Sequence, residues 1–193
     1  MPAAALILAS TSRYRAELLS RLHLPFDTAA PGVDESRLDS ESGPAMSVRL
    51  ATAKARAVAE RFPGAVVIGS DQCALRGDEV LGKPGDVATA CEQLLAASGR
   101  RIDFHTAVCV RDAEGIDHVF SDITRVRFRV LDADSVRRYV EAEQPLDCAG
   151  SFKVEGLGIT LFEAVESRDP TALVGLPLIA LAACLRQLGY ALP

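Results

Sequence analysis

The sequence predicts an α/β fold in which a mixed, twisted sheet is flanked by helices. Two observations support this class. Short apolar segments alternate along the chain with segments of helical periodicity. In addition, apolar and polar residues alternate along two consecutive segments, residues 103–112 and 118–131, which the turn residues "DAEG" join. This pattern predicts an antiparallel hairpin with one solvent-exposed face. All 193 residues are expected to form one domain.

The first third of the chain predicts strand, helix, loop, helix and strand. "LILAS" is typical of a short buried strand, and it runs into a helix expected from Ser12 to about Leu22. The polar stretch 28–44 predicts a loop, and residues 45–62 predict an amphipathic helix. The apolar run "AVVIGSDQ", residues 65–72, indicates a strand that is covered on both faces and ends at a polar tip.

The rest of the chain continues this alternation. Asp86 is placed to cap a helix over residues 87–98, which Gly99 closes. The other expected elements are, in order, a turn with a short strand within 73–85, the hairpin, a helix at about 134–143, a glycine-rich loop followed by a strand within 148–167, and a C-terminal helix near 176–188.

Composition excludes several classes of protein. The net charge of −5 argues against binding nucleic acid or anionic membranes by bulk charge. No apolar run approaches the roughly 20 residues that span a bilayer, and no secretory signal is expected. The 5 cysteines form no CxxC pair, which argues against structural zinc and a disulfide scaffold and suits a reducing cytoplasm. If this acidic chain binds phosphates, it needs a local cluster of cations.

The stretch "ASTSRYRAELL" places Arg13 and Arg15 in the first turn of a helix. Cations there oppose the helix dipole and cost about 0.3–1 kcal/mol each, whereas the free N–H groups of that turn favour an anion. An anion bound by Ser10, Ser12, the amides and a guanidinium would explain the pattern. Two solvated arginines on a surface helix would explain it equally well.

Carboxylates and lysines that could serve a phosphate site are spread along the chain. Asp71 lies in "GSDQ" at the end of an apolar strand, where open α/β sheets usually place ligands, and suits a divalent ion or a general base. It could also be a turn residue or a helix cap. Glu35 adds a carboxylate from a loop in which acidic residues are often merely solvated. Lys83 lies in the tight loop "LGKPG", and Lys153 and Glu155 lie in "SFKVEG".

Lys54 lies within the apolar sector of its predicted helix, and Arg61 lies near the same edge. Snorkelling explains both positions as well as a functional role does.

Other catalytic patterns are missing from the sequence. It has no GxxxxGK[ST] loop and no HExxH motif, its three histidines show no ligand spacing, and Cys148 lacks an evident histidine partner.

Taken together and in order, these segments resemble the Maf family of nucleoside triphosphate pyrophosphatases over essentially the whole chain. The similar segments are "LILASTSRYRAELL", "DE" at 34–35, "RLATAKA", "IGSDQ", "GKP", "PLDCAGSFKVEGLGITLF" and "VGLPL". "SDQ" and "CAGSFKVEG" resemble the branch that hydrolyses 7-methyl-GTP. The resemblance implies an elongated, ITPase-like molecule with two lobes around a central cleft. We expect the first helix start, Asp71 and "SFKVEG" to line that cleft.

The resemblance also implies roles for individual residues. Water attacks the α-phosphorus and releases pyrophosphate, with Asp71 as proton acceptor, Glu35 as its acidic partner, and Mg²⁺ or Mn²⁺ held by these two carboxylates. The residues expected to face the phosphates are Ser10, Arg15, Lys54 and Lys83, of which Lys83 is also placed among the catalytic residues. Those expected to recognise the base are Tyr14, Gln72 and Glu155. Arg13 departs from the proline common in the family. The small-molecule nucleotide is the implied partner, and a homodimer is implied as well.

The expected base fits these residues physically. N7-methylation makes guanine cationic, so the Tyr14 ring could bind it by a cation–π interaction of about 0.5–2 kcal/mol. Glu155 could accept hydrogen bonds from guanine N1–H and the amino group. Two alternatives stay open: the same reaction on other nucleotides such as dTTP, UTP or CTP, and a nucleotide-binding regulator of cell division without turnover.

Overall fold

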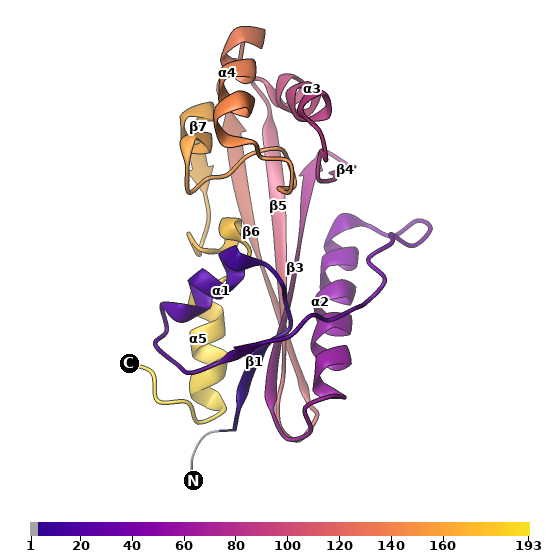
Figure 1. Cartoon of the computed structure of the whole chain (residues 1–193), viewed down its shortest axis with the longest axis vertical. Helices are drawn as coiled ribbons and strands as arrows, with labels where there is room; N and C mark the ends of the chain where they lie inside the picture. The colour runs from indigo at the N-terminus through magenta and orange to yellow at the C-terminus, as the bar shows by residue number, and fades with distance from the viewer. Residues whose placement is uncertain (1–3) are drawn as a thin grey trace.

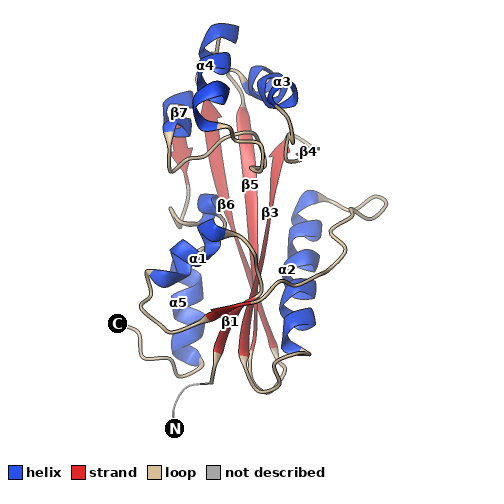
Figure 2. Ribbon diagram, viewed as in Figure 1, coloured by secondary structure: helices blue, strands red, loops and turns tan. Residues whose placement is uncertain are grey.

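A computed structural model describes residues 4–193. Its mixed sheet of seven strands has the order β2-β1-β3-β5-β6-β7, with β4 paired to β3. Five α-helices flank the sheet, so the predicted fold class is confirmed (Figures 1 and 2). The elements are β1 Leu6–Leu8, α1 Arg13–Ser20, β2 Asp27–Thr28, α2 Gly43–Ala59, β3 Val66–Arg76, β4 Glu79–Leu81, α3 Val87–Ala97, β5 Arg101–Arg111, β6 Asp117–Phe128, α4 Ala133–Glu143, the 3₁₀ helix η1 Leu157–Leu161, β7 Phe162–Glu166, the 3₁₀ helix η2 Ala172–Val174, and α5 Leu178–Gln187.

The long strands β3, β5 and β6 run the length of the molecule and carry helices at both ends (Figure 1). At one end α1 and α5 pack on one face of the sheet, in a core that includes Leu18, Ile68 and Leu181. α2 packs on the opposite face through Ala51, Ala55 and Val58. We call this end the first lobe.

At the other end α3 and α4 cover the same face of the sheet as α1 and α5, because Ala74 and Phe104 in their core alternate in step with Ile68 of the first lobe. We call this end the second lobe (Figure 2). Its core contains Phe104, Phe128 and Phe152, and the rings of Phe104 and Phe152 meet edge to face with centroids 5.3 Å apart. Among residues 4–193, no helix has the length and apolarity needed to cross a membrane.

Most of the expected elements are present, with shifted ends. The "DAEG" turn joins β5 to β6, and the Asp86 side chain accepts the Thr89 N–H at the start of α3, as expected of a cap. α2 begins two residues before the predicted range and ends at Ala59, so Phe62 lies outside it and is 40% exposed. The two-residue strand β2 and both 3₁₀ helices were not predicted, because segments this short show no periodicity. Residues 1–3 of the predicted domain lie outside the described residues.

One boundary error matters for the site. The strand predicted over residues 65–72 continues to Arg76, so Asp71 lies in the middle of β3 and not at its end. The strand continues because Cys73 pairs with His105 of β5, and Ala74 pairs with both Phe104 and Leu81. The expectation that the strand ends at "GSDQ", with Asp71 at its tip, was therefore wrong.

Candidate active site

The site lies where one edge of β3 has no neighbouring strand. β5 pairs with β3 along the whole opposite edge, whereas β1 pairs only with residues 66–68 and β4 only with residues 74–76. Residues 69–73 are left open between them. A cavity of about 850 Å³ lies at this gap, and both lobes contribute to its lining. An interruption of strand pairing thus exposes the middle of a buried strand to the cleft.

Lys54 joins the two carboxylates that were expected to be catalytic. Its ammonium donates to Asp71 Oδ1 at 2.7 Å and lies 2.8 Å from Glu35 Oε1. The Lys54 and Asp71 side chains are 6% and 10% exposed, whereas the Glu35 side chain is 56% exposed. Lys54 does not snorkel to solvent. It provides the counter-charge for a carboxylate at the base of the cleft.

Gly69 explains how α2 brings Lys54 so close to β3. A Cβ atom at Gly69 would lie 2.2 Å from Ala51 O and 2.6 Å from Ala55 N, distances that real Cβ atoms essentially never show. The helix backbone therefore rests directly on a position without a side chain. Gly69 and Asp71 are two residues apart on one strand, so they face the same side of the sheet, where α2 lies.

The environment shifts the pKa values of Asp71, Glu35 and Arg15. Burial raises the pKa of Asp71, while the charges of Lys54 and Arg15 oppose the shift without cancelling it. Burial also disfavours ionisation of Glu35, but Lys54, Lys83 and Arg15 outweigh it and the net pKa is lowered. Burial lowers the pKa of the Arg15 guanidinium, against the opposing charges of Asp71 and Glu35.

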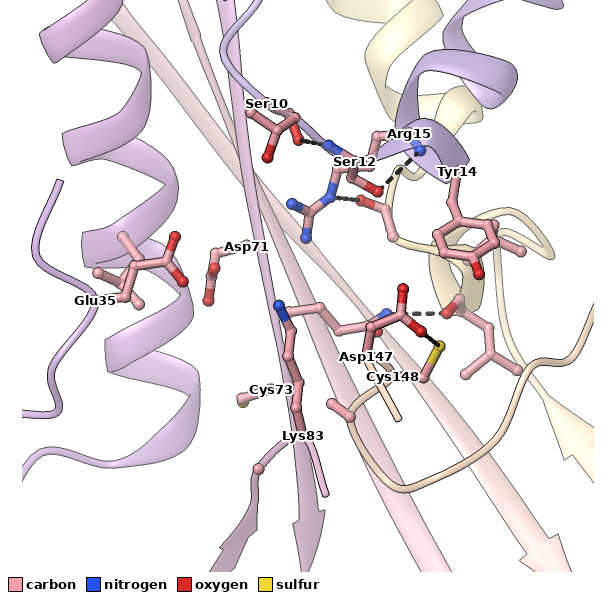
Figure 3. Close-up of a pocket in the computed structure, with 18 of the residues that line it drawn as sticks. Ser10, Ser12, Tyr14, Arg15, Glu35, Asp71, Cys73, Lys83, Asp147 and Cys148 are labelled. Carbon is pink, nitrogen blue, oxygen red and sulfur yellow. Dashed lines mark hydrogen bonds between the residues drawn. The ribbon is translucent and has the colours of Figure 1, made fainter. Parts of the chain in front are cut away.

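The start of α1 provides the cation and the hydroxyls that the sequence indicated. Ser12 accepts the Arg15 N–H at 3.4 Å as the helix cap, and Ser10 Oγ accepts the Ser12 N–H at 3.0 Å. The Arg15 side chain donates from Nε to Gly175 O at 3.0 Å, and Ser70 Oγ lies 2.9 Å from the same carbonyl. This contact fixes Arg15 with its terminal nitrogens toward the cleft (Figure 3).

Lys83 approaches the same space from the second lobe. In Figure 3 its amine extends toward Asp71 and Arg15 from the opposite side of the cavity. The loop that carries it is tied down at two points. Gly85 N–H donates to Leu146 O at 3.1 Å, and the Gln93 side chain donates to Gly82 O at 3.3 Å. Arg15 of α1, Lys54 of α2 and Lys83 of this loop thus approach Asp71 from three separate segments of the chain (Figure 3).

The residues expected to recognise the base line the other part of the cavity. Tyr14 and Glu155 both belong to its lining. The Arg13 guanidinium lies 4.8 Å from the centre of the Tyr14 ring and donates to its hydroxyl at 2.9 Å. Gln72 directs its amide nitrogen away from the cavity, to Thr106 Oγ1 and the carbonyls of η2, at 2.8 to 3.1 Å. Only its side-chain oxygen is left for a ligand.

Several further lining residues were not singled out as part of the site. Asp147, Cys148 and Phe152 belong to the cavity wall, and the Cys148 thiol donates to Asp147 at 3.4 Å. Burial raises the pKa of Cys148 to about 12, so its thiol is not activated as a nucleophile. Asp147 and Cys148 lie shortly before "SFKVEG" and Phe152 lies within it, which was the available indication. Arg61 lies outside the cavity lining, where its guanidinium donates to the exposed Ala30 carbonyl.

The carboxylate oxygens of Asp71 and Glu35 are ligands of the kind that a hard divalent ion prefers. Within residues 4–193, no group of three or more His, Cys, Asp or Glu side chains is placed to hold a metal. Asp71 and Glu35, however, already converge on one cation, the Lys54 ammonium. Mg²⁺ commonly keeps several waters and binds one or two carboxylates together with substrate phosphates, so two carboxylates beside a cluster of cations are a sufficient set of protein ligands for such an ion.

Comparison with known proteins agrees with this architecture. Proteins named 7-methyl-GTP pyrophosphatase from Xanthomonas campestris pv. campestris (strain 8004) and Alcanivorax borkumensis are 57% and 52% identical to this chain. Each match covers 97% of the chain, and 98% and 96% of the respective relative. The solved Ham1 proteins of Staphylococcus aureus and Coxiella burnetii share the fold, with TM-scores of 0.52 and 0.56 and identities of 14% and 16%. These matches cover 95% of the chain and 98% and 99% of the two structures. The model of the family described as Maf-like protein matches residues 5–188. The chain therefore belongs to the Maf family.

Proposed function

We propose that the protein hydrolyses 7-methyl-GTP to the nucleoside monophosphate and pyrophosphate. The observation that carries this proposal is the convergence of Arg15, Lys54 and Lys83 around Asp71 in one cavity. Cations that surround a carboxylate can bind a triphosphate and activate water beside it. The printed names of relatives at more than 50% identity over the whole chain support the same activity.

In the proposed reaction Asp71 accepts a proton from a water molecule. The water oxygen forms a bond to the α-phosphorus, and the bond from that phosphorus to the oxygen that bridges to the β-phosphorus breaks. Pyrophosphate leaves with the bridging oxygen. Burial raises the pKa of Asp71 toward the working pH, which makes the carboxylate a better general base. Lys54 orients the Asp71 carboxylate, and Arg15 and Lys83 bind the phosphates.

Asp71 and Glu35 are the residues that would hold a divalent ion such as Mg²⁺ or Mn²⁺. A bound ion would supply positive charge to the phosphate oxygens. Lys54 contacts both carboxylates at 2.7 and 2.8 Å, so its ammonium has a second role in keeping the two oxygens close together before the nucleotide arrives.

Tyr14 and Glu155 support the choice of a methylated purine. An aromatic face and a carboxylate complement a cationic ring that carries N–H donors, whereas a neutral pyrimidine would gain less from either group. The Arg13 guanidinium lies over the Tyr14 ring at 4.8 Å, so it has to leave that face if the base stacks there. The other face of the ring needs no such movement.

The decisive experiment measures pyrophosphate release from a panel of nucleotides with Mg²⁺. We expect 7-methyl-GTP to have the highest kcat/KM, and Asp71→Asn to lower kcat by about 10²–10⁴ with the fold intact. Faster turnover of dTTP, UTP or CTP would assign a different substrate. Nucleotide binding without release of pyrophosphate would favour a regulator of cell division. Near-normal turnover by Asp71→Asn would refute the assigned base.

Two properties of the whole protein belong to the same proposal. A reducing cytoplasm suits its five free cysteines. The homodimer implied by the resemblance stays a prediction, which light scattering of the purified protein would test.

A further inference from the structure

The turn that carries Glu155, residues 153–158, is fixed to the C-terminal end of α4 by contacts in both directions. The Leu157 N–H donates to the Glu143 carboxylate at 3.0 Å. In return, the Lys153 ammonium donates to the backbone carbonyls of Glu143 and Gln144 at 2.8 and 3.2 Å. Glu143 therefore holds this turn through both its side chain and its backbone.

Gly156 makes room for the Glu143 carboxylate. A Cβ atom at Gly156 would lie 2.7 Å from each of the two Glu143 carboxylate oxygens. The φ angle of Gly156 is −117°, which any residue can adopt, so glycine is needed here for space and not for backbone freedom. Tyr139, one helical turn before Glu143, accepts the Lys153 N–H at 2.9 Å and fixes the other end of the turn.

Glu155 depends on this attachment for its own position. Its residue is exposed at the rim of the cavity, and among the described residues no hydrogen bond or salt bridge holds its carboxylate. The backbone of the turn therefore sets the region of the cavity that this carboxylate can reach. A displacement of about 1 Å is enough to weaken a directional contact strongly.

We propose that Glu143 is a positioning residue for base recognition: by anchoring the 153–158 turn, it places Glu155 against the base. This inference rests on the proposed function. It predicts that Glu143 affects the choice among nucleotides, which the phosphate-binding part of the cavity does not determine.

The experiment compares kcat/KM for 7-methyl-GTP with kcat/KM for GTP in each variant. Glu143→Ala should lower this ratio by about tenfold, because the turn loses its anchor. Glu143→Gln should keep the ratio within about twofold, because its amide oxygen still accepts the Leu157 N–H. Gly156→Ala should lower the ratio as well, since its Cβ displaces the carboxylate. Glu141→Ala, at an exposed position on the same helix, is the matched control and should leave the ratio unchanged.

A double-mutant cycle separates positioning from general damage. In a Glu155→Ala background, Glu143→Ala should change the ratio no further, since its effect passes through Glu155. An equal loss in both backgrounds would overturn the inference, as would a ratio unaffected by Glu143→Ala alone. A pyrophosphatase whose selectivity depends on Glu155 but not on Glu143 would overturn this inference only. Selectivity independent of Glu155 would overturn the proposed base recognition as well.

Discussion

The close contact between α2 and β3 makes Gly69→Ala a demanding test of the structure. The new methyl group would meet Ala51 O at 2.2 Å and Ala55 N at 2.6 Å. Both are backbone atoms within a regular helix, so no side-chain rotation can relieve the contact. The whole helix has to move away from the strand.

The size of the movement follows from the contact distance. Real Cβ atoms essentially never approach another atom closer than 3.0 Å, so α2 has to retreat by about 0.8 Å along the line to Ala51 O. Overpacking of this kind costs about 1–3 kcal/mol of unfolding free energy. The same movement carries Lys54 away from Asp71. In the native structure Lys54 Nζ lies 2.7 Å from Asp71 Oδ1. A misplacement approaching 1 Å at a catalytic group can lower the rate by up to about 10²-fold.

Urea denaturation and steady-state pyrophosphate release measure the two effects on the same preparations. Gly82→Ala is a suitable control for stability, because a Cβ there has no atom within 4 Å. Ala55→Gly added to Gly69→Ala should not restore stability, since the two shortest contacts involve backbone. A Gly69→Ala protein with unchanged unfolding free energy and unchanged kcat would refute the proposed helix contact.

Two further predictions concern segments that support the site. The hydrogen bond from Arg49 lowers the pKa of Glu41 from 4.5 to about 2, so the stabilisation is present above pH 4.5 and is lost as the pH falls toward 2. The difference in Tm between wild type and Glu41→Gln should shrink over that interval, and a constant difference would contradict the assignment. Asp169 accepts the Ile179 N–H at 2.6 Å and caps α5, so Asp169→Ala should cost about 2 kcal/mol in urea denaturation. Asp169→Asn should cost less, and equal losses would argue against a capping role.

For Lys54, the sequence alone predicted the position on its helix but not the partners of its side chain. Helical periodicity placed it in the apolar sector of α2, and its burial confirms that placement. Periodicity could not distinguish snorkelling from a buried ion pair, because the distinction depends on partners elsewhere in the chain. Asp71 is 17 residues away, and Glu35 lies in a loop whose path the pattern does not determine.

The residues around Asp71 explain why the sequence predicted that this strand ends at residue 72, whereas β3 continues to Arg76. Three consecutive polar residues, Ser70, Asp71 and Gln72, normally favour a turn after an apolar strand. In the fold each has a distant partner: Ser70 lies 2.9 Å from Gly175 O, Asp71 accepts from Lys54, and Gln72 donates to the carbonyls of η2. Polar side chains are tolerated in a buried strand when such partners satisfy them, and tertiary structure alone supplies these partners.

The charges at the cleft explain why an acidic protein can bind a polyanion and why a divalent ion belongs in the proposal. The cavity lining carries five cations against four carboxylates, so it has only a small excess of positive charge: the cations are Arg13, Arg15, Lys54, Lys83 and Lys153, and the carboxylates are Glu35, Asp71, Asp147 and Glu155. A nucleoside triphosphate carries about four negative charges near neutral pH. The side chains alone leave most of that charge unbalanced. Since Asp71 is only 10% exposed, solvent screens the repulsion between it and the phosphates poorly. Tight binding of the nucleotide therefore requires additional positive charge beside Asp71, where the second carboxylate, Glu35, would help to retain it.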